Sequence, residues 1–252
     1  MNKARDFREK LILKADDTER KKISFKYFEL EEGAVWKPDK FDDEVMFYFL
    51  NGRGYIFGYM HMHSVALSWL FSQDKAFWLP RHCPFYMKNT GIGKIEIIAA
   101  YGKNAPERVC VTAPVEKRLQ DCYKIHDRPH VLDVFWRASE IQNAGGENLF
   151  DFELNTFHQG FTQRRHLSPP GAEEFMYVIR GEGKIEVGDE SFVVKPGSLV
   201  YVPPNVFHKV IREDEDDLFQ YLTWIYLSEN EDLEFPDWQV KAKSLRKHYF
   251  DY

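Results

Sequence analysis

The sequence has few cysteines and no long apolar run. Its 252 residues include only three cysteines, Cys83, Cys110 and Cys122, at scattered spacings and without a Cys-x-x-Cys pair. This odd, scattered set argues against a disulfide framework. No apolar segment approaches the ~20 residues that a membrane-spanning helix needs, and the longest apolar stretch near the N-terminus, residues 11–13, is too short for a signal peptide. We therefore expect a cytoplasmic protein that does not contact a membrane.

Positive charge is scarcer than negative charge. The formal net charge is −6, from 34 Lys and Arg against 40 Asp and Glu, and the pI is about 5.9. Proteins that bind nucleic acid need a basic surface to neutralise phosphates. The sequence therefore predicts no nucleic-acid partner, and no helix-turn-helix pattern flanks its strand-rich segments.

Aromatic residues are abundant, at 16% of the chain. They concentrate in two segments, about 23–100 and 149–227, as short β-branched and aromatic runs separated by turn residues. This regular spacing is typical of a β-sandwich or barrel. The segment between them has a weaker pattern, with a short helix predicted over 115–123.

The chain is accordingly divided into three parts. We predict an N-terminal barrel over 1–114, a linker over 115–148 and a C-terminal barrel over 149–252. The last part ends in an aromatic-rich tail, 229–252, which we expect to pack on its own barrel or on a partner subunit. The two strand-rich segments also align with each other, with His208 on Phe85, which suggests an internal duplication.

The C-terminal segment contains two spaced motifs, GFTQRRHLSPPGAEEFMYVIRG and GSLVYVPPNVFH. Together they resemble the two signature motifs of the cupin superfamily, in which glycines and a proline frame the metal ligands. The matching positions are Gly160, His166, Glu174, Gly181, Gly197, Pro203 and His208. The sequence departs from the motifs at Ser168, where a second His is expected, in the longer segment before Glu174, and at Asn205 and Arg212.

The resemblance implies an all-β chain of two tandem cupin barrels, of the jelly-roll type, joined by a short helical linker. It also implies a metal site built from His166, Glu174 and His208. Two imidazoles and one carboxylate with open coordination positions suit Fe(II) and also accept Mn, Ni or Zn. The strand period agrees, because alternation places Glu174 and Met176 on one face of their strand.

Two further side chains are candidates for the catalytic site. Arg212 lies four residues past His208, so on a continuing strand it points the same way and suits a carboxylate-bearing substrate. A surface arginine in an acidic run is the alternative. His158 shares its strand parity with Thr156, and both are predicted to point into the barrel.

The N-terminal barrel is expected to lack the metal site. Phe85 occupies the position of His208, which indicates a degenerate, structural barrel. His61 and His63 lie two residues apart on a predicted strand, and together with His82 they form the alternative of a second metal site.

Three functions remain open from the sequence. The His-then-Glu ligand pattern is similar to that of ring-cleaving dioxygenases, such as 3-hydroxyanthranilate and homogentisate dioxygenases, which implies an Fe(II) enzyme acting on a small acidic metabolite. The alternatives are a metal-dependent isomerase or aminohydrolase of a sugar acid or ureido acid, and a non-catalytic cupin that binds a small ligand. Each has a small-molecule partner, and pairing of sheet edges predicts a homodimer.

Overall fold

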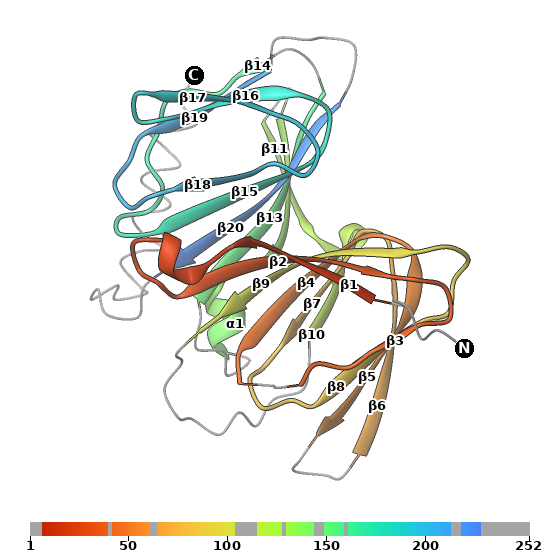
Figure 1. Cartoon of the computed structure of the whole chain (residues 1–252). Coiled ribbons are helices and arrows are strands. Elements are labelled where there is room, and N and C mark those ends of the chain that lie inside the picture. The colour runs from red at the N-terminus through yellow and green to blue at the C-terminus, as the bar shows by residue number, and fades with distance from the viewer. Residues whose placement is uncertain are drawn as a thin grey trace.

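The chain folds almost entirely into β-strands that form two barrels. The computed structural model describes residues 7–39, 42–60, 65–103, 115–127, 130–143, 149–158, 161–212 and 218–227. Figure 1 shows the two strand-built halves packed against each other. The predicted all-β architecture of two tandem barrels is confirmed.

The N-terminal half contains one large and one small sheet. Its elements are β1 (Phe7–Leu13), the 3-10 helix η1 (Ala15–Asp17), β2 (Ile23–Leu30), β3 (Val35–Trp36), β4 (Glu44–Asn51), β5 (Arg53–Met60), β6 (Val65–Ser72), β7 (Lys75–Leu79), β8 (Phe85–Asn89), β9 (Ile95–Gly102) and β10 (Val115–Arg118). The six-stranded sheet has the order β1-β2-β9-β4-β7-β10, and the four-stranded sheet has the order β3-β8-β5-β6.

The C-terminal half has the same division. Its elements are the 3-10 helix η2 (Leu119–Asp121), β11 (Tyr123–Asp127), β12 (His130–Trp136), α1 (Ala138–Asn143), β13 (Leu149–Phe157), β14 (Phe161–Thr162), β15 (Glu173–Arg180), β16 (Gly183–Val187), β17 (Glu190–Val194), β18 (Leu199–Val202), β19 (His208–Arg212) and β20 (Phe219–Leu227). The sheets have the orders β11-β12-β13-β20-β15-β18 and β14-β19-β16-β17.

The two halves repeat one arrangement. Strand β4 lies between β9 and β7, as β15 lies between β20 and β18. Both strands end at a register shift followed by a glycine with positive φ, Gly52 at 89° and Gly181 at 72°. A Cβ atom at Gly181 would lie 2.3 Å from the carbonyl oxygen of Leu218, so only glycine fits there. Strand β8 begins at Phe85 as β19 begins at His208, in agreement with the alignment of the two segments.

Residues 115–148 contribute strands as well as a connection. Strand β10 pairs with β7 of the first barrel, whereas β11 and β12 extend the sheet of β13 in the second. The short helix predicted over 115–123 is wrong, because Val115–Arg118 pair residue by residue with β7 and only the turn Leu119–Asp121 is helical. The one α-helix of this segment among the described residues is α1.

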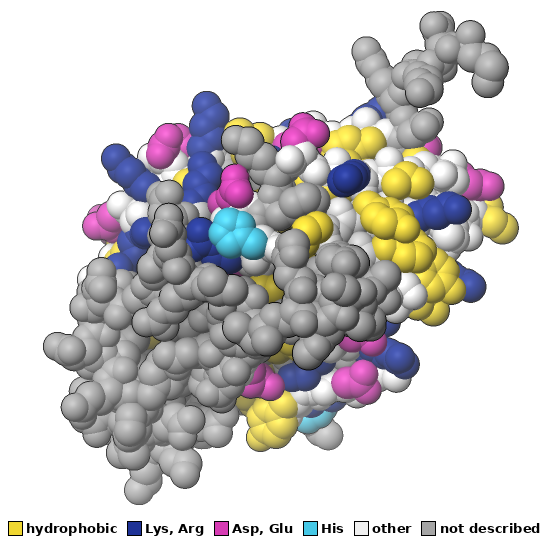
Figure 2. All heavy atoms as spheres, turned by 90° about the horizontal axis from the view of Figure 1, so that it is seen from below, with side chains coloured by type: hydrophobic (Ala, Val, Ile, Leu, Met, Phe, Trp, Pro, Cys, Tyr) yellow, Lys and Arg dark blue, Asp and Glu magenta, His cyan; other side chains and the backbone are white. Residues whose placement is uncertain are grey.

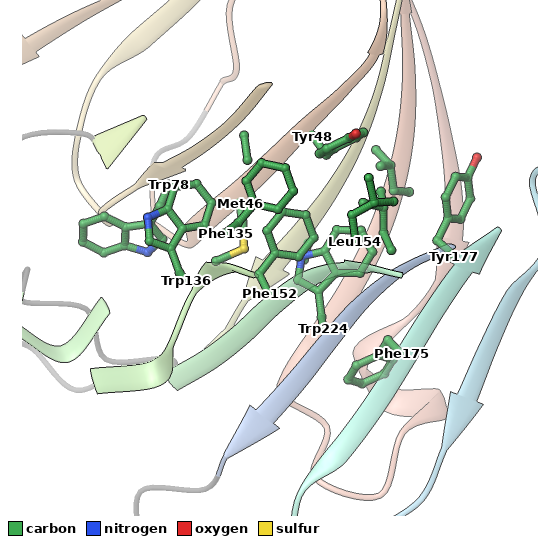
Figure 3. Packing of buried hydrophobic residues seen from close by; sticks show 14 of the residues in the cluster. Met46, Tyr48, Trp78, Phe135, Trp136, Phe152, Leu154, Phe175, Tyr177 and Trp224 are labelled. Carbon is green, nitrogen blue, oxygen red and sulfur yellow. The ribbon is translucent and has the colours of Figure 1, made fainter. Parts of the chain in front are cut away.

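The two six-stranded sheets pack face to face through an apolar cluster (Figure 3). The Phe25 ring of the first barrel lies 5.0 Å from Phe175 and 5.1 Å from Trp224 of the second, measured between centroids. Tyr48 and Phe152 make a similar edge contact at 6.1 Å. Both sheets are therefore buried on both faces, one face in this shared core and the other inside its own barrel.

Each barrel also has an apolar interior of its own. The first is filled largely with aromatic rings, namely Phe28, Trp36, Phe47, Phe49, Phe71, Phe77 and Phe85. The second has a smaller, more aliphatic cluster that includes Met176, Val178, Val202 and Val210. Buried polar side chains, described below, share the second interior with this cluster.

Some apolar side chains remain at the surface. Figure 2 shows them grouped on part of the face seen from below. Among the described residues of the N-terminal half, the exposed large apolar side chains include Val35, Leu70, Tyr86 and Ile92. In the described part of the chain, no helix combines the length and hydropathy that crossing a membrane requires.

Candidate metal centre

The backbone holds His166 and His208 together. His208 is the first residue of β19, and His166 lies in the segment after β14. The amide nitrogen of each residue donates to the carbonyl oxygen of the other, both at 2.9 Å. The two ring centroids are 4.2 Å apart. The motif spacing therefore brings both imidazoles to one place.

Glu174 adds a carboxylate to the two imidazoles. It is a buried residue near the start of β15 and shares its face with Met176 and Val178. Its Oε2 atom lies 3.3 Å from Nε2 of His208 and accepts a hydrogen bond of 2.8 Å from Oγ of Ser168. Ser168 stands where the motif has its second histidine, and its hydroxyl binds the Glu174 carboxylate. We name His166, Glu174 and His208 the His–Glu–His cluster.

Burial determines the charge states in the His–Glu–His cluster. It lowers the pKa of His208 to about 4, and burial together with the neighbouring His208 lowers the pKa of His166. Burial also raises the pKa of Glu174, an effect opposed by His166 and by the Ser168 hydroxyl. Both imidazoles are therefore neutral near neutral pH, which is the form that binds a metal ion.

The donor set fits a divalent cation in its chemistry. Both ring nitrogens of His208 are buried without a hydrogen-bond partner, an arrangement that costs free energy unless something binds there. Nδ1 of His166 lies 2.9 Å from the carbonyl oxygen of Arg164, so its Nε2 is the nitrogen that remains for a ligand role. Across the part of the chain that the structure describes, no three His, Cys, Asp or Glu side chains already have the spacing of a metal-binding group. A cation here would therefore require side-chain rotation within the cluster.

Removing the Ser168 hydroxyl tests its support of Glu174. In Ser168→Ala the carboxylate loses a donor that favours its ionised form, so the pKa of Glu174 rises further. A hydrogen bond to a charged group contributes about 1.5–3 kcal/mol, so we expect at least a tenfold loss of divalent-metal affinity near neutral pH. A metal titration across pH should show the binding midpoint at higher pH. An unchanged midpoint, equal to that of the exposed control Ser191→Ala, would contradict this role.

The N-terminal barrel does not repeat the His–Glu–His cluster at the equivalent positions. By strand register, Val45 stands where Glu174 lies and Phe85 stands where His208 lies. The Phe85 ring packs 5.6 Å from Phe47 and 5.7 Å from Trp36, measured between centroids, so an aromatic core occupies this place.

Of the histidines proposed for a second site, His82 is within the described residues. His82 is half exposed, with Arg81 Nε donating to its Nε2 at 3.1 Å. His61 and His63 lie outside the described residues.

The inward face of β13 differs from the predicted one. Phe152 and Leu154 belong to the core between the barrels, so the alternate residues Asp151, Glu153 and Asn155 face the barrel interior. The prediction that Thr156 and His158 point inward is therefore wrong. Alternation in the sequence marks two faces, but both faces of this strand are buried, so alternation alone cannot say which is the inner one.

The two predicted catalytic residues differ in burial. His158 is exposed just after β13. Arg212 is buried at the end of β19, four residues beyond His208, and its Nη1 donates to the carbonyl oxygen of Glu182.

A segment of the N-terminal half contacts the loop before Glu174. The amide nitrogen of Arg20 donates to Oε1 of Glu173 at 3.0 Å, and the Arg20 guanidinium donates to the carbonyl oxygen of Gly171. The Tyr201 hydroxyl donates to the same Glu173 oxygen at 2.7 Å and accepts from the amide of Glu19. The first barrel therefore helps to hold the strand that presents Glu174.

A polar group inside the second barrel is absent from the sequence-based prediction. Nη1 of Arg137 lies 2.8 Å from Oδ2 of Asp151 and 2.5 Å from Oε1 of Glu153. Oδ1 of Asn155 accepts a hydrogen bond from Nε2 of His130 at 2.8 Å, and Nδ2 of Asn155 donates to the hydroxyl of Thr223 at 3.0 Å. The signal is present in DFELN, where polar residues alternate with apolar ones, but the same pattern is typical of a solvated strand face.

Glu153 should make the stability of the protein fall as pH rises. Burial raises the pKa of Glu153 from 4.5 to about 7, although Arg137 opposes the shift. The folded state therefore binds more protons than the unfolded state between these values, and its stability is lost as pH rises through about 7. In urea unfolding, wild type should lose on the order of 2–3 kcal/mol more than Glu153→Gln between about pH 5 and pH 8. An equal pH dependence of the two proteins would contradict this expectation, and the exposed Glu190→Gln should behave like wild type.

Comparison with solved structures identifies the class of fold. The chain is similar to a variant of oxalate decarboxylase from Bacillus subtilis, with a TM-score of 0.69 and 12% identity over 86% of this chain and 72% of that one. It is also similar to the 7S globulin of Momordica charantia, with a TM-score of 0.71 and 12% identity over 91% and 82% of the two chains. At these identities the likeness shows the fold, which is the two-barrel bicupin fold.

Comparison of sequences places the second barrel in a family. Residues 154–225, which include the whole His–Glu–His cluster, match the model of the cupin domain. The C-terminal barrel is therefore similar to the cupin domain, and the chain as a whole has the two-barrel fold. A segment of 39 residues is 38% identical to the uncharacterised protein MJ1618 of Methanocaldococcus jannaschii and covers 16% of this chain and 31% of that protein. The match thus spans about a third of that relative.

Proposed function

We propose that this protein is a metal-dependent bicupin enzyme with a single active site in the C-terminal barrel. His166, Glu174 and His208 would hold one divalent metal ion, and the N-terminal barrel would be structural. The observation that carries the proposal is the meeting of the buried His208 imidazole, the half-buried His166 imidazole and the buried Glu174 carboxylate. The ring nitrogens of His208 have no hydrogen-bond partner beyond the 3.3 Å approach of Nε2 to Glu174. Such polar atoms are retained in an interior when they have a ligand.

The reaction that we propose is an Fe(II)-type dioxygenation of a small acidic metabolite. A set of two histidines and one carboxylate leaves coordination positions open, which suits non-haem Fe(II) oxygenases. When bound, the metal would supply sites where substrate and oxygen meet. The protein's own side chains would position the substrate, with Arg212 as the candidate for its carboxylate group. Mn, Ni and Zn are the alternative metals, and oxalate decarboxylase from Bacillus subtilis, a protein of similar fold, has Mn(II) centres.

One observation favours a second candidate, a metal-dependent isomerase or aminohydrolase. These reactions need a group that moves protons, and the buried carboxyl group of Glu153 faces the same barrel interior as the His–Glu–His cluster. Here the metal would act as a Lewis acid on a carbonyl group.

Metal analysis followed by oxygen uptake separates these functions. Iron in the purified protein, with oxygen consumption on a panel of small hydroxy and amino acids, supports the dioxygenase. Bound Mn, Ni or Zn with product formation and no oxygen uptake supports the isomerase or aminohydrolase. Bound metal without turnover of any compound supports a ligand-binding cupin, and a protein that takes up no metal on reconstitution overturns the proposal.

For its partners we propose a small-molecule substrate and a second copy of the chain in the cytoplasm. The strands β17 and β6 lie at sheet edges, and exposed edges favour pairing between chains. The described Cys122 is a free thiol, in keeping with a reducing compartment. Sedimentation equilibrium should give twice the chain mass of 29.9 kDa, and a monomer at micromolar concentration would contradict the dimer.

A further inference from the structure

Three polar residues of β13 face the interior of the second barrel. Asp151, Glu153 and Asn155 are 2%, 6% and 5% exposed, and they alternate with Phe152 and Leu154 of the core between the barrels. Carboxylates are almost never buried to this extent without a partner. Each of the three therefore needs a reason for its place.

Two of these residues have structural partners that account for them. Oδ1 of Asp151 accepts from the amide nitrogen of Ala138 at 2.7 Å, at the start of α1, and Oδ2 pairs with Arg137. Asn155 bridges β12 and β20 through His130 and Thr223. Both side chains therefore join neighbouring elements of the sheet.

Glu153 is not accounted for in the same way. Its Oε1 shares one guanidinium nitrogen, Nη1 of Arg137, with Asp151. One cation thus faces two buried carboxylates, although the pairing with Asp151 alone already neutralises Arg137. Burial raises the pKa of Glu153 to about 7, with Asp151 and Glu174 adding to the effect and Arg137 opposing it. The carboxyl group is therefore poised to gain or lose a proton near neutral pH.

The strand register places Glu153 beside the His–Glu–His cluster. Strands β13 and β15 flank β20, with Glu153 opposite Thr223 and Thr223 opposite Met176. Glu174 lies two residues before Met176 on the same face of β15. Neighbouring strands are about 4.8 Å apart and residues two apart along a strand are about 7 Å apart, so the backbones of Glu153 and Glu174 are roughly 12 Å apart across one sheet face. A substrate held at the His–Glu–His cluster would therefore have Glu153 as a neighbour on the same sheet face.

Tyr221 lies on the same face of β20, two residues from Thr223. It is a buried residue of β20, opposite Asn155 on one side and Val178 on the other. Burial, with Glu174 and Glu153, holds the pKa of Tyr221 well above its ordinary value. Its hydroxyl therefore stays protonated near neutral pH.

We propose that Glu153 is a catalytic acid–base residue that exchanges a proton with a hydroxyl group of a substrate held at the His–Glu–His cluster. In this step the substrate O–H bond breaks, the proton moves to a carboxylate oxygen of Glu153 and the electron pair stays on the substrate oxygen. The substrate class is a small compound with a weakly acidic hydroxyl, such as a hydroxyaromatic or hydroxamate group. This inference rests on the proposed function, because the cluster must hold the substrate.

The test counts protons on ligand binding. The full chain is loaded with Zn²⁺, which has no redox chemistry, and titrated calorimetrically with catechol and with acetohydroxamic acid in two buffers of different protonation enthalpy. Both probes keep their hydroxyl protonated in water at about pH 8, where Glu153 is mostly ionised. Wild type should release few protons to the buffer, whereas Glu153→Gln should release about one more proton per bound ligand. Glu44→Gln, which removes an equally buried carboxylate from the first barrel, should behave like wild type.

The outcomes separate this inference from the proposed function. Failure of the wild type to retain Zn²⁺ would overturn the proposed function before any ligand is added. Retained Zn²⁺ with equal proton release by wild type and Glu153→Gln would overturn the role of Glu153 alone, as would the absence of binding by both probes. Loss of Zn²⁺ from Glu153→Gln would make Glu153 a structural residue and would also overturn the inference.

Discussion

Replacing His208 with alanine should lower the affinity for divalent metal more than about 100-fold. His208 is the most buried member of the His–Glu–His cluster, and both its ring nitrogens lack a hydrogen-bond partner in the protein. The substitution removes one of the two imidazole donors of the cluster. Among the described residues, His208 is the histidine that pairs with Glu174. Equilibrium dialysis with Zn²⁺ or Mn²⁺ measures the change directly.

The matched control for this prediction is His126→Ala. His126 is exposed on β11, in the same half of the chain and outside the barrel interior, so its removal should leave metal affinity unchanged. Equal affinity in wild type and His208→Ala would show that metal, if bound, lies elsewhere. A loss of metal affinity in His61→Ala, with unchanged affinity in His208→Ala, would place the site in the first barrel.

Replacing Trp224 with alanine should lower the free energy of unfolding by about 3–5 kcal/mol. Trp224 is fully buried and contacts Phe25 of the first barrel at 5.1 Å and Phe152 of its own sheet at 4.7 Å, between ring centroids. Because this core belongs to both barrels, the loss should destabilise both. In guanidinium, the variant should unfold in a single transition whose midpoint concentration is lower than that of wild type. Hydrogen exchange of amides in β4 and in β15 should show that both halves unfold in that transition.

Val193→Ala is the control for the loss in the core. Val193 is 80% exposed on the edge strand β17, so its truncation should change stability by less than about 0.5 kcal/mol. Two separate transitions in Trp224→Ala, with the first barrel unaffected, would contradict a shared core and make the barrels independent domains.

The motif spacing predicts the parts of the site that depend on local geometry. Glycines at turn positions fix where a strand ends, and Gly181 with φ of 72° ends β15 seven residues after Glu174. His208 begins β19, as expected from its place after Pro203. The long loop between His166 and Glu174 departs from the motif, yet the backbone pairing of His166 with His208 brings the two rings together.

Other features depend on contacts between distant segments and were not predictable. The inner face of β13 could not be told from its outer face, because Phe152 packs against the first barrel and not inside the second. The partner of Glu153 is Arg137, which precedes a helix in a segment assigned to a linker. The strand at Val115–Arg118 forms because β7 offers an open edge, a property of the folded sheet that the local sequence does not encode.

An anomalous-difference map from crystals grown with Mn²⁺ or Zn²⁺ tests the central claim most directly. The account predicts one strong peak per chain in the C-terminal barrel, bonded to a nitrogen of His166, a nitrogen of His208 and a carboxylate oxygen of Glu174, with no peak beside Phe85. A metal-free C-terminal barrel, or a peak in the N-terminal barrel near His82, would contradict it.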